Sequence, residues 1–188
     1  MDFEAQVESL TGLTISSSGT TPTQAELTQF LSDGVCDVVN KMIDLKPQEL
    51  HKFASTTTDS SNSGIVYTGR ILSVMRHHDS TSIIRSCEPV DASDRYDATD
   101  ETSLKFRSKT NPGYYILNQK IFTVPASAGS NNDAVVTQVA YDTGLAYTDS
   151  SIDNFPTEYE YLVPMYAAIK SLEAKMAEYT IDEEDVEL

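Results

Sequence analysis

The sequence predicts an α+β fold in which helices from both ends of the chain form a bundle and the central region forms two β-hairpins. Apolar residues recur with the helical period in residues 1–55 and again in residues 155–180. β-Branched and aromatic residues gather between residues 64 and 140, in runs separated by glycine, proline and asparagine. The 188 residues, 39% of them hydrophobic, are enough for a single domain with one sizeable core.

Two helices are expected in the first 55 residues. A short amphipathic helix starts the chain and ends at Gly12, because glycine adopts the left-handed conformation at little cost. A linker rich in serine and threonine follows. Thr23 and Glu26 then match a capping box, in which each side chain satisfies an otherwise unpaired backbone N–H. The capping box predicts a long helix over residues 24–44.

The predicted long helix has a continuous apolar stripe that must be buried. Gly34 lies on this stripe and costs about 1 kcal/mol relative to alanine, so we expect another backbone to pass close to it. Pro47 ends the helix and can begin a shorter one. A second serine- and threonine-rich linker is expected at residues 54–64. The other members of the stripe are Leu27, Phe30, Leu31, Val35, Val38, Val39, Met42 and Ile43.

The central region, residues 64–140, predicts two hairpins and one further strand. The first hairpin joins two β-prone runs through a solvent-exposed loop that contains His77 and His78. The second has a tight turn at Asn118, which tolerates a positive φ better than most residues do. The cluster of valines in residues 134–140 favours an additional strand.

The C-terminal helix is the most regular element. Pro164 lies within it, so we expect a helix start at about Leu162 or a kink near residue 160. Its large apolar residues form a heptad-like seam, which can pack against the helix of residues 24–44 or meet another subunit. Tyr159 and Tyr161 do not share the face of the seam well and are further candidates for a subunit contact. The seam, spaced 3, 4, 3, 4 and 3 residues apart, is Leu162, Met165, Ile169, Leu172, Met176 and Tyr179.

Charge excludes several classes of function. The chain has 29 acidic and 13 basic residues, a net charge of −16, and no basic stretch that would neutralise a row of phosphates. Residues 70–120 are nearly neutral and both ends are acidic; residues 181–188 form an acidic tail, read as a solvated end or as a docking strip for a basic partner. No apolar run approaches the roughly 20 residues of a membrane span, and the polar start lacks the features of a signal peptide. We therefore expect no membrane association and synthesis in the cytoplasm.

No pattern in the sequence predicts an enzyme. His77, His78 and Asp79 are adjacent, and neighbouring side chains of an extended chain point to opposite faces, so a shared metal ion is not expected. Cys36 and Cys87 are expected to be reduced, buried thiols. The eight glycines form no phosphate-binding loop. We expect no catalytic residue, cofactor or metal, and interpret the chain as an interaction protein.

Three segments resemble small virion proteins of tailed bacteriophages, marine ones in particular. They are TQAELTQFLSDGVCDVVNKM, the tyrosine-rich GYYILNQKIFTVPAS, and FPTEYEYLVPMYAAIKSLEAKMAEY, which contains the pattern P-x-E-Y-x-x-L-V. The order of elements is similar to that of head-to-tail connector, or portal adaptor, proteins. The resemblance implies a helical bundle with projecting β elements, no catalytic residues, and a closed homo-oligomeric ring, typically of twelve subunits, beneath the portal.

The resemblance and the charge lead to one functional hypothesis. The helices of residues 24–44 and 162–179 would form the wall of a ring in the neck of the virion. The hairpins would contact neighbouring copies or the tail tube or nozzle proteins, and an acidic ring would let DNA pass without specific binding. Another neck or tail-completion protein, or a fibre-associated host-binding module with an exposed aromatic groove, is the alternative. The interface candidates are Leu162, Met165, Ile169, Leu172, Met176, Tyr159, Tyr161, His77, His78 and Asn118.

Overall fold

A computed structural model of the chain has the expected α+β fold, with a helical bundle that includes a long C-terminal helix and a β region of two sheets. The structure describes the backbone of residues 1–184 and the side chains of residues 1–180, so the side chains of the predicted acidic tail, residues 181–188, lie outside it. The chain folds into two compact units. Unit 1 combines residues 1–53 with the segment from residue 141 onward, and unit 2 is the continuous segment of residues 54–140.

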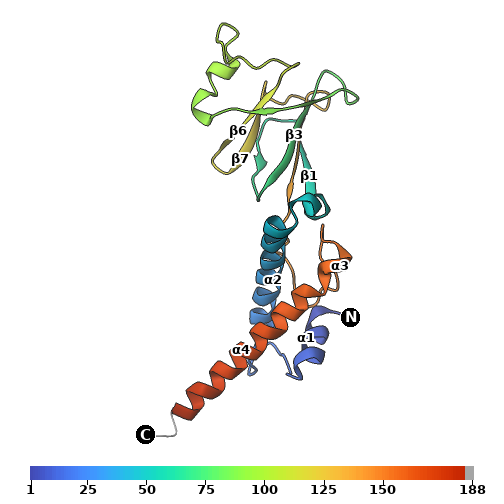
Figure 1. Cartoon of the computed structure of the whole chain (residues 1–188), viewed down its shortest axis with the longest axis vertical. Helices are drawn as coiled ribbons and strands as arrows, with labels where there is room; N and C mark the ends of the chain where they lie inside the picture. The colour runs from blue at the N-terminus through green and yellow to red at the C-terminus, as the bar shows by residue number, and fades with distance from the viewer. Residues whose placement is uncertain (185–188) are drawn as a thin grey trace. The chain divides into compact units, whose positions relative to one another are not determined.

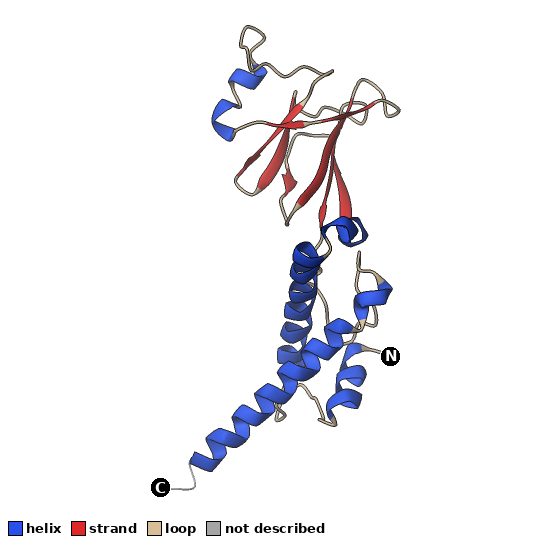
Figure 2. Ribbon diagram, in the orientation of Figure 1, coloured by secondary structure: helices blue, strands red, loops and turns tan. Residues whose placement is uncertain are grey.

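Unit 1 is helical (Figures 1 and 2). The predicted break before Leu162 is confirmed, because the chain leaves the helical hydrogen-bonding pattern at Tyr161 between two helices. The elements of unit 1 are α1 (Phe3–Thr11), α2 (Gln24–Leu45), the 3-10 helix η1 (Pro47–Phe53), α3 (Thr157–Glu160) and α4 (Leu162–Glu184).

The helix ends follow the signals in the sequence. The carboxylate of Asp2 accepts a hydrogen bond from the Ala5 N–H at the start of α1, and Gly12 ends that helix at φ 70°. Both halves of the predicted capping box are present at the start of α2, where Thr23 and Glu26 each accept a hydrogen bond from the other's backbone N–H. Such caps stabilise a helix by about 1 kcal/mol each.

Helices α2 and α4 approach each other closely at Gly34, as its place on the apolar stripe predicts. A Cβ atom at Gly34 would lie 3.3 Å from the Val163 carbonyl oxygen and 3.2 Å from Cδ1 of Tyr166. The absence of a side chain at Gly34 makes room for the Tyr166 ring and the α4 backbone, and the fully buried face of α4 carries mostly small side chains. The buried residues on this face are Val163, Ala167, Ala168 and Ser171.

Of the two alternatives for the heptad-like seam, packing against the helix of residues 24–44 is wrong for most of its length. Val163 and Tyr166 meet α2 at Gly34, while Leu162, Met165 and Ile169 line an open groove beside α2. The seam residues from Met165 to Tyr179 are exposed.

The first sheet of unit 2 is antiparallel throughout. Its strand β8 lies between β1 and β3, and β3 also pairs with β4, which forms the first predicted hairpin. The predicted strand at residues 134–140 is confirmed as β8. In spatial order the strands are β1 (Ala54–Asp59), β8 (Ala134–Val139), β3 (Ile71–His77) and β4 (Ile84–Ser86).

The second sheet contains the other predicted hairpin. Strands β6 and β7 are joined by a two-residue turn, with Asn118 at φ 50° and Gln119 at φ 58°. Two consecutive positive φ values are those of a type I′ turn, which matches the twist of a hairpin. The sheet order is β2 (Ile65–Val66), β7 (Lys120–Val124), β6 (Gly113–Leu117) and β5 (Glu88–Pro89), with β5 parallel to β6.

The expectation of a linker over residues 54–64 is wrong in its first half. Residues 54–59 form the edge strand β1, which pairs with β8 from Ala54 opposite Val139 to Asp59 opposite Ala134. Threonine is β-branched and suits a half-exposed strand, and the Thr56 and Thr137 hydroxyls lie 3.0 Å apart across the pair. Only the turn from Ser60 to Gly64 behaves as a loop.

The core of unit 2 draws residues from both sheets, including Val74 and Val136 of the first and Ile65 and Ile121 of the second. Cys87 is buried among them, and burial raises the pKa of its thiol to about 12. Cys36, in unit 1, is also a free thiol but is half-buried.

Arg76 projects into the same interior and is only 2% exposed. Its guanidinium donates to the carbonyl oxygens of Pro125 at 3.0 Å, Ala126 at 3.1 Å and His77 at 3.0 Å, and to Asn132 at 3.3 Å. Burial lowers the pKa of Arg76 from its usual range. The side chain thereby fixes the irregular segment between β7 and β8.

The crossing at Gly34 predicts the effect of a larger residue there. Gly34→Val should lower the free energy of unfolding by about 1–3 kcal/mol, because the new side chain meets Val163 and Tyr166. Urea unfolding followed by circular dichroism at 222 nm measures the change. Asp33→Val is the matched control, since Asp33 is exposed on the same helix. Equal losses in the two variants would contradict the close crossing.

Candidate functional site

The most prominent surface feature is the apolar seam along α4. Five large apolar side chains in succession are at least two-fifths exposed, whereas the first member of the predicted seam, Leu162, is half-buried. Contiguous exposed apolar side chains are uncommon on a monomeric protein and mark surfaces that contact a partner. The exposed fractions are 47% for Met165, 55% for Ile169, 42% for Leu172, 68% for Met176 and 59% for Tyr179.

The seam follows from the helical period. Its members are spaced four, three, four and three residues apart, which places them in one stripe on the side of α4 away from the small buried residues. In Figure 2, α4 continues past α1 and past the start of α2, so the last turns of the seam have no helix of unit 1 beside them. Sequence periodicity identified these residues correctly as one surface.

Two hollows flank the beginning of the seam. A groove of about 380 Å³ lies between α2 and α4 and is lined largely by apolar residues. A second hollow of about 360 Å³ lies between α1 and α4, where Leu10 and Tyr161 are each 58% exposed. Met165 lines both hollows. The main apolar lining of the first groove is Val38, Met42, Leu45, Leu162, Met165 and Ile169.

Charge is unevenly divided between the two units. Unit 1 contains 20 acidic residues, five lysines and no arginine, whereas unit 2 contains nine acidic and eight basic residues. Two of the five lysines, Lys41 and Lys46, lie at the C-terminal end of α2 and line the groove, and a third, Lys52, lies on η1. Each has an acidic partner: for example, Lys41 Nζ lies 2.6 Å from Asp37.

Tyr159 and Tyr161 have different environments in unit 1. The Tyr159 ring stacks on Phe53 with centroids 5.8 Å apart. Its hydroxyl donates to Glu49 at 2.9 Å, and this hydrogen bond is the main reason that the pKa of Glu49 lies below its usual value. Tyr159 therefore belongs to the packing of unit 1, while Tyr161 remains exposed at the second hollow.

The histidines predicted in a solvent-exposed hairpin loop are largely buried. Nδ1 of His77 contacts the carboxylate of Asp133, and both side chains are 13% exposed. His78 is 23% exposed, and its Nδ1 has no hydrogen-bond partner among the described residues. Asn118, by contrast, is exposed at the tip of its turn. Of the three interface candidates in unit 2, Asn118 is therefore more accessible to a partner than His77 or His78.

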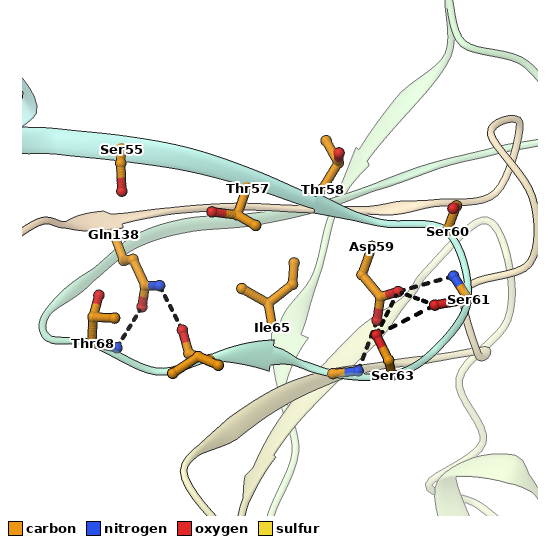
Figure 3. A pocket seen from close by; sticks show the side chains of 12 residues that line it. Ser55, Thr57, Thr58, Asp59, Ser60, Ser61, Ser63, Ile65, Thr68 and Gln138 are labelled. Atoms are coloured by element: carbon orange, nitrogen blue, oxygen red, sulfur yellow. Dashed lines mark hydrogen bonds between the residues drawn. The ribbon is translucent and has the colours of Figure 1, made fainter.

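Unit 2 has a polar pocket of about 450 Å³ that the sequence did not indicate (Figure 3). It lies between β1 and the segment that contains β2. Gln138 spans one end, donating to the Val66 carbonyl at 2.7 Å and accepting from the Thr68 N–H at 3.1 Å. The lining includes the serine and threonine hydroxyls of the segment that was expected to be a linker.

Asp59 closes the other end of the pocket and is 8% exposed. It accepts hydrogen bonds from the Ser61 N–H at 2.9 Å, the Gly64 N–H at 2.8 Å, and the hydroxyls of Ser61 and Ser63 at 3.0 and 3.3 Å. Burial alone would raise the pKa of Asp59, but these hydrogen bonds outweigh it, and the pKa lies below its usual value. The Asp59 carboxylate thereby holds the turn from Ser60 to Gly64 in its conformation.

The spacing of Asp59, Ser61, Ser63 and Gly64 matches the first half of a helix-loop-helix calcium site, but the donor set does not fit. Such a loop needs a bidentate glutamate at its twelfth position, where this chain has Arg70. One carboxylate, with an arginine in place of the bidentate glutamate, is a poor ligand set for a divalent cation. The turn is therefore a structural feature of unit 2.

The chain matches no protein-family model, and no curated protein matches its sequence. Among the helices in the described part of the chain, none has the length and apolar character needed to cross a membrane. The exposed seam and its two flanking hollows form the candidate site.

The hydrogen bonds to Asp59 predict a pH-dependent contribution to stability. Because the folded pKa is depressed, this stability is present at neutral pH and is lost as the pH falls through the folded pKa, below the ordinary value of about 3.9. Asp59→Asn should lower the free energy of unfolding at pH 7 by about 1–3 kcal/mol and should reduce its loss in acid. Urea unfolding at a series of pH values measures both effects.

Asp100→Asn is the control for this prediction. Asp100 also accepts two hydrogen bonds from a following residue, Thr102, but it is exposed to solvent. Its substitution should change stability by less than about 0.5 kcal/mol. A similar loss for both variants would show that burial of Asp59 is unimportant.

Proposed function

We propose that this chain is a structural protein of the bacteriophage virion, a head-to-tail connector that forms a ring beneath the portal, joins the capsid to the tail and lets DNA pass. The observation that carries the proposal is the exposed apolar seam of α4. A helix face of this kind requires a partner surface, and a second copy of the chain is the partner most readily available to a protein that builds an assembly.

The arrangement of surfaces in unit 1 supports a ring. Ring contacts are heterologous: one face of a subunit meets a different face of its neighbour, so each subunit needs two separate adhesive surfaces. Unit 1 has an apolar ridge on α4 and apolar hollows on either side of its beginning. The segments that resemble connector proteins coincide with α2, with the β6–β7 hairpin, and with α3 and α4.

Charge supports a path for DNA without binding. With 20 acidic residues against five lysines, unit 1 repels phosphate groups, and a ring would multiply this charge by the number of copies. DNA near such a surface slides and is not held. A neighbouring neck or tail-completion protein would use the same seam and the same charge, and the proteins that co-purify with this chain from intact particles distinguish the two roles.

The proposal predicts assembly that depends on the seam. Mass photometry and negative-stain imaging of the purified protein, alone and with the portal protein of the same phage, should reveal rings. Ile169→Glu should weaken assembly by roughly tenfold or more, because it places a charge in a desolvated contact. Ala25→Glu adds the same charge at an exposed site on α2 and should leave assembly intact. A protein that stays monomeric and never binds portal would contradict the proposal.

A further inference from the structure

We propose, resting on the function above, that the C-terminal half of α4 in one copy seats in the groove between α2 and α4 of the next copy. The exposed surface of unit 1 divides into a projecting part and a receiving part. The two parts share no residue, so they can serve as the two sides of one heterologous contact.

The projecting part is the ridge formed by Leu172, Met176 and Tyr179. These side chains are 42%, 68% and 59% exposed, and none of them lines either hollow of unit 1. Their spacing of four and three residues is that of the anchor residues by which an amphipathic helix binds an apolar groove. The ridge from Leu172 to Tyr179 is about 10–11 Å long at 1.5 Å per residue.

The receiving part is the groove, which runs along α2 from Asp37 to Lys46. The helical part of this stretch, from Asp37 to Leu45, is about 12 Å long, slightly longer than the ridge. Leu45 at its end is 76% exposed, and Met165 and Ile169 form the α4 side at 47% and 55% exposure. A helix laid in the groove would cover all three side chains.

Charge favours this pairing over a parallel contact between two identical seams. In the sequence, five acidic residues follow Tyr179, so a parallel pair of α4 helices would bring the two most acidic segments together. In the groove, the ridge lies beside two of the five lysines of unit 1, Lys41 and Lys46. Lys41 and Lys46 have side chains that are 67% and 47% exposed, so they remain accessible to acidic groups of a neighbouring copy.

Two single substitutions test the contact from opposite sides. Leu45→Glu alters only the groove and Met176→Glu alters only the ridge; both positions are exposed, at 76% and 68%, so the fold should be retained. Ala25→Glu is the charge-matched control. Mass photometry should show that each of the first two variants loses ring assembly, with association at least tenfold weaker than that of the wild type.

A mixture of the two variants gives the decisive result. The intact ridge of Leu45→Glu fits the intact groove of Met176→Glu, so an equimolar mixture should form a dimer containing one copy of each and nothing larger. Rings that survive Leu45→Glu but not Met176→Glu would overturn the groove contact and leave the connector function standing. Rings that survive both substitutions would also overturn the groove contact and leave the connector function standing. A wild-type protein that forms no ring, with or without portal, would overturn the proposed function and the contact with it.

Discussion

The close crossing of α2 and α4 is the constraint on which the arrangement of unit 1 depends. Gly34 has no side chain, so the Val163 carbonyl oxygen and the Tyr166 ring of α4 lie 3.3 and 3.2 Å from the position that a Cβ atom would take. Val163, Ala167, Ala168 and Ser171 form the buried face of α4, and the helical period places the large apolar residues of the seam elsewhere on the helix. The exposed seam is therefore the face of α4 that the contacts within unit 1 leave uncovered.

In α4, one face makes the contacts within unit 1 and a different face is exposed for contacts outside the unit. The small buried residues of α4 pack inside unit 1, and the large residues of the seam remain available for contacts outside the unit. The division of charge follows a similar pattern, because nearly all of the excess negative charge belongs to unit 1 while unit 2 is close to neutral. A surface that is both apolar along one stripe and strongly acidic around it can associate in a few orientations only, which favours a defined assembly over aggregation.

Patterns of residues close together in the sequence made much of the fold predictable. The predictions that were wrong depend on contacts between residues far apart in the sequence. The capping box at Thr23, the left-handed Gly12 and the turn at Asn118 are set by residues a few positions apart, and the structure confirms each of them. The direction of the seam and the strand β1 depend on neighbours far along the chain. A 3-4 spacing looks the same whether a stripe faces inward or outward, and the small residues at Ala167, Ala168 and Ser171 were the signal that would have distinguished the two. The turn at Asp59 and the burial of His77 against Asp133 likewise needed the pairing of β1, β3 and β8.

The composition of the seam also gives it a chemical vulnerability. Two of its five exposed side chains, Met165 and Met176, are thioethers. Oxidation converts an exposed methionine to its sulfoxide, which replaces a flexible apolar group with a polar one and leaves the backbone unchanged. An oxidant thus alters the adhesive character of α4 without unfolding it, and a reductase that restores methionine returns the surface to its original state.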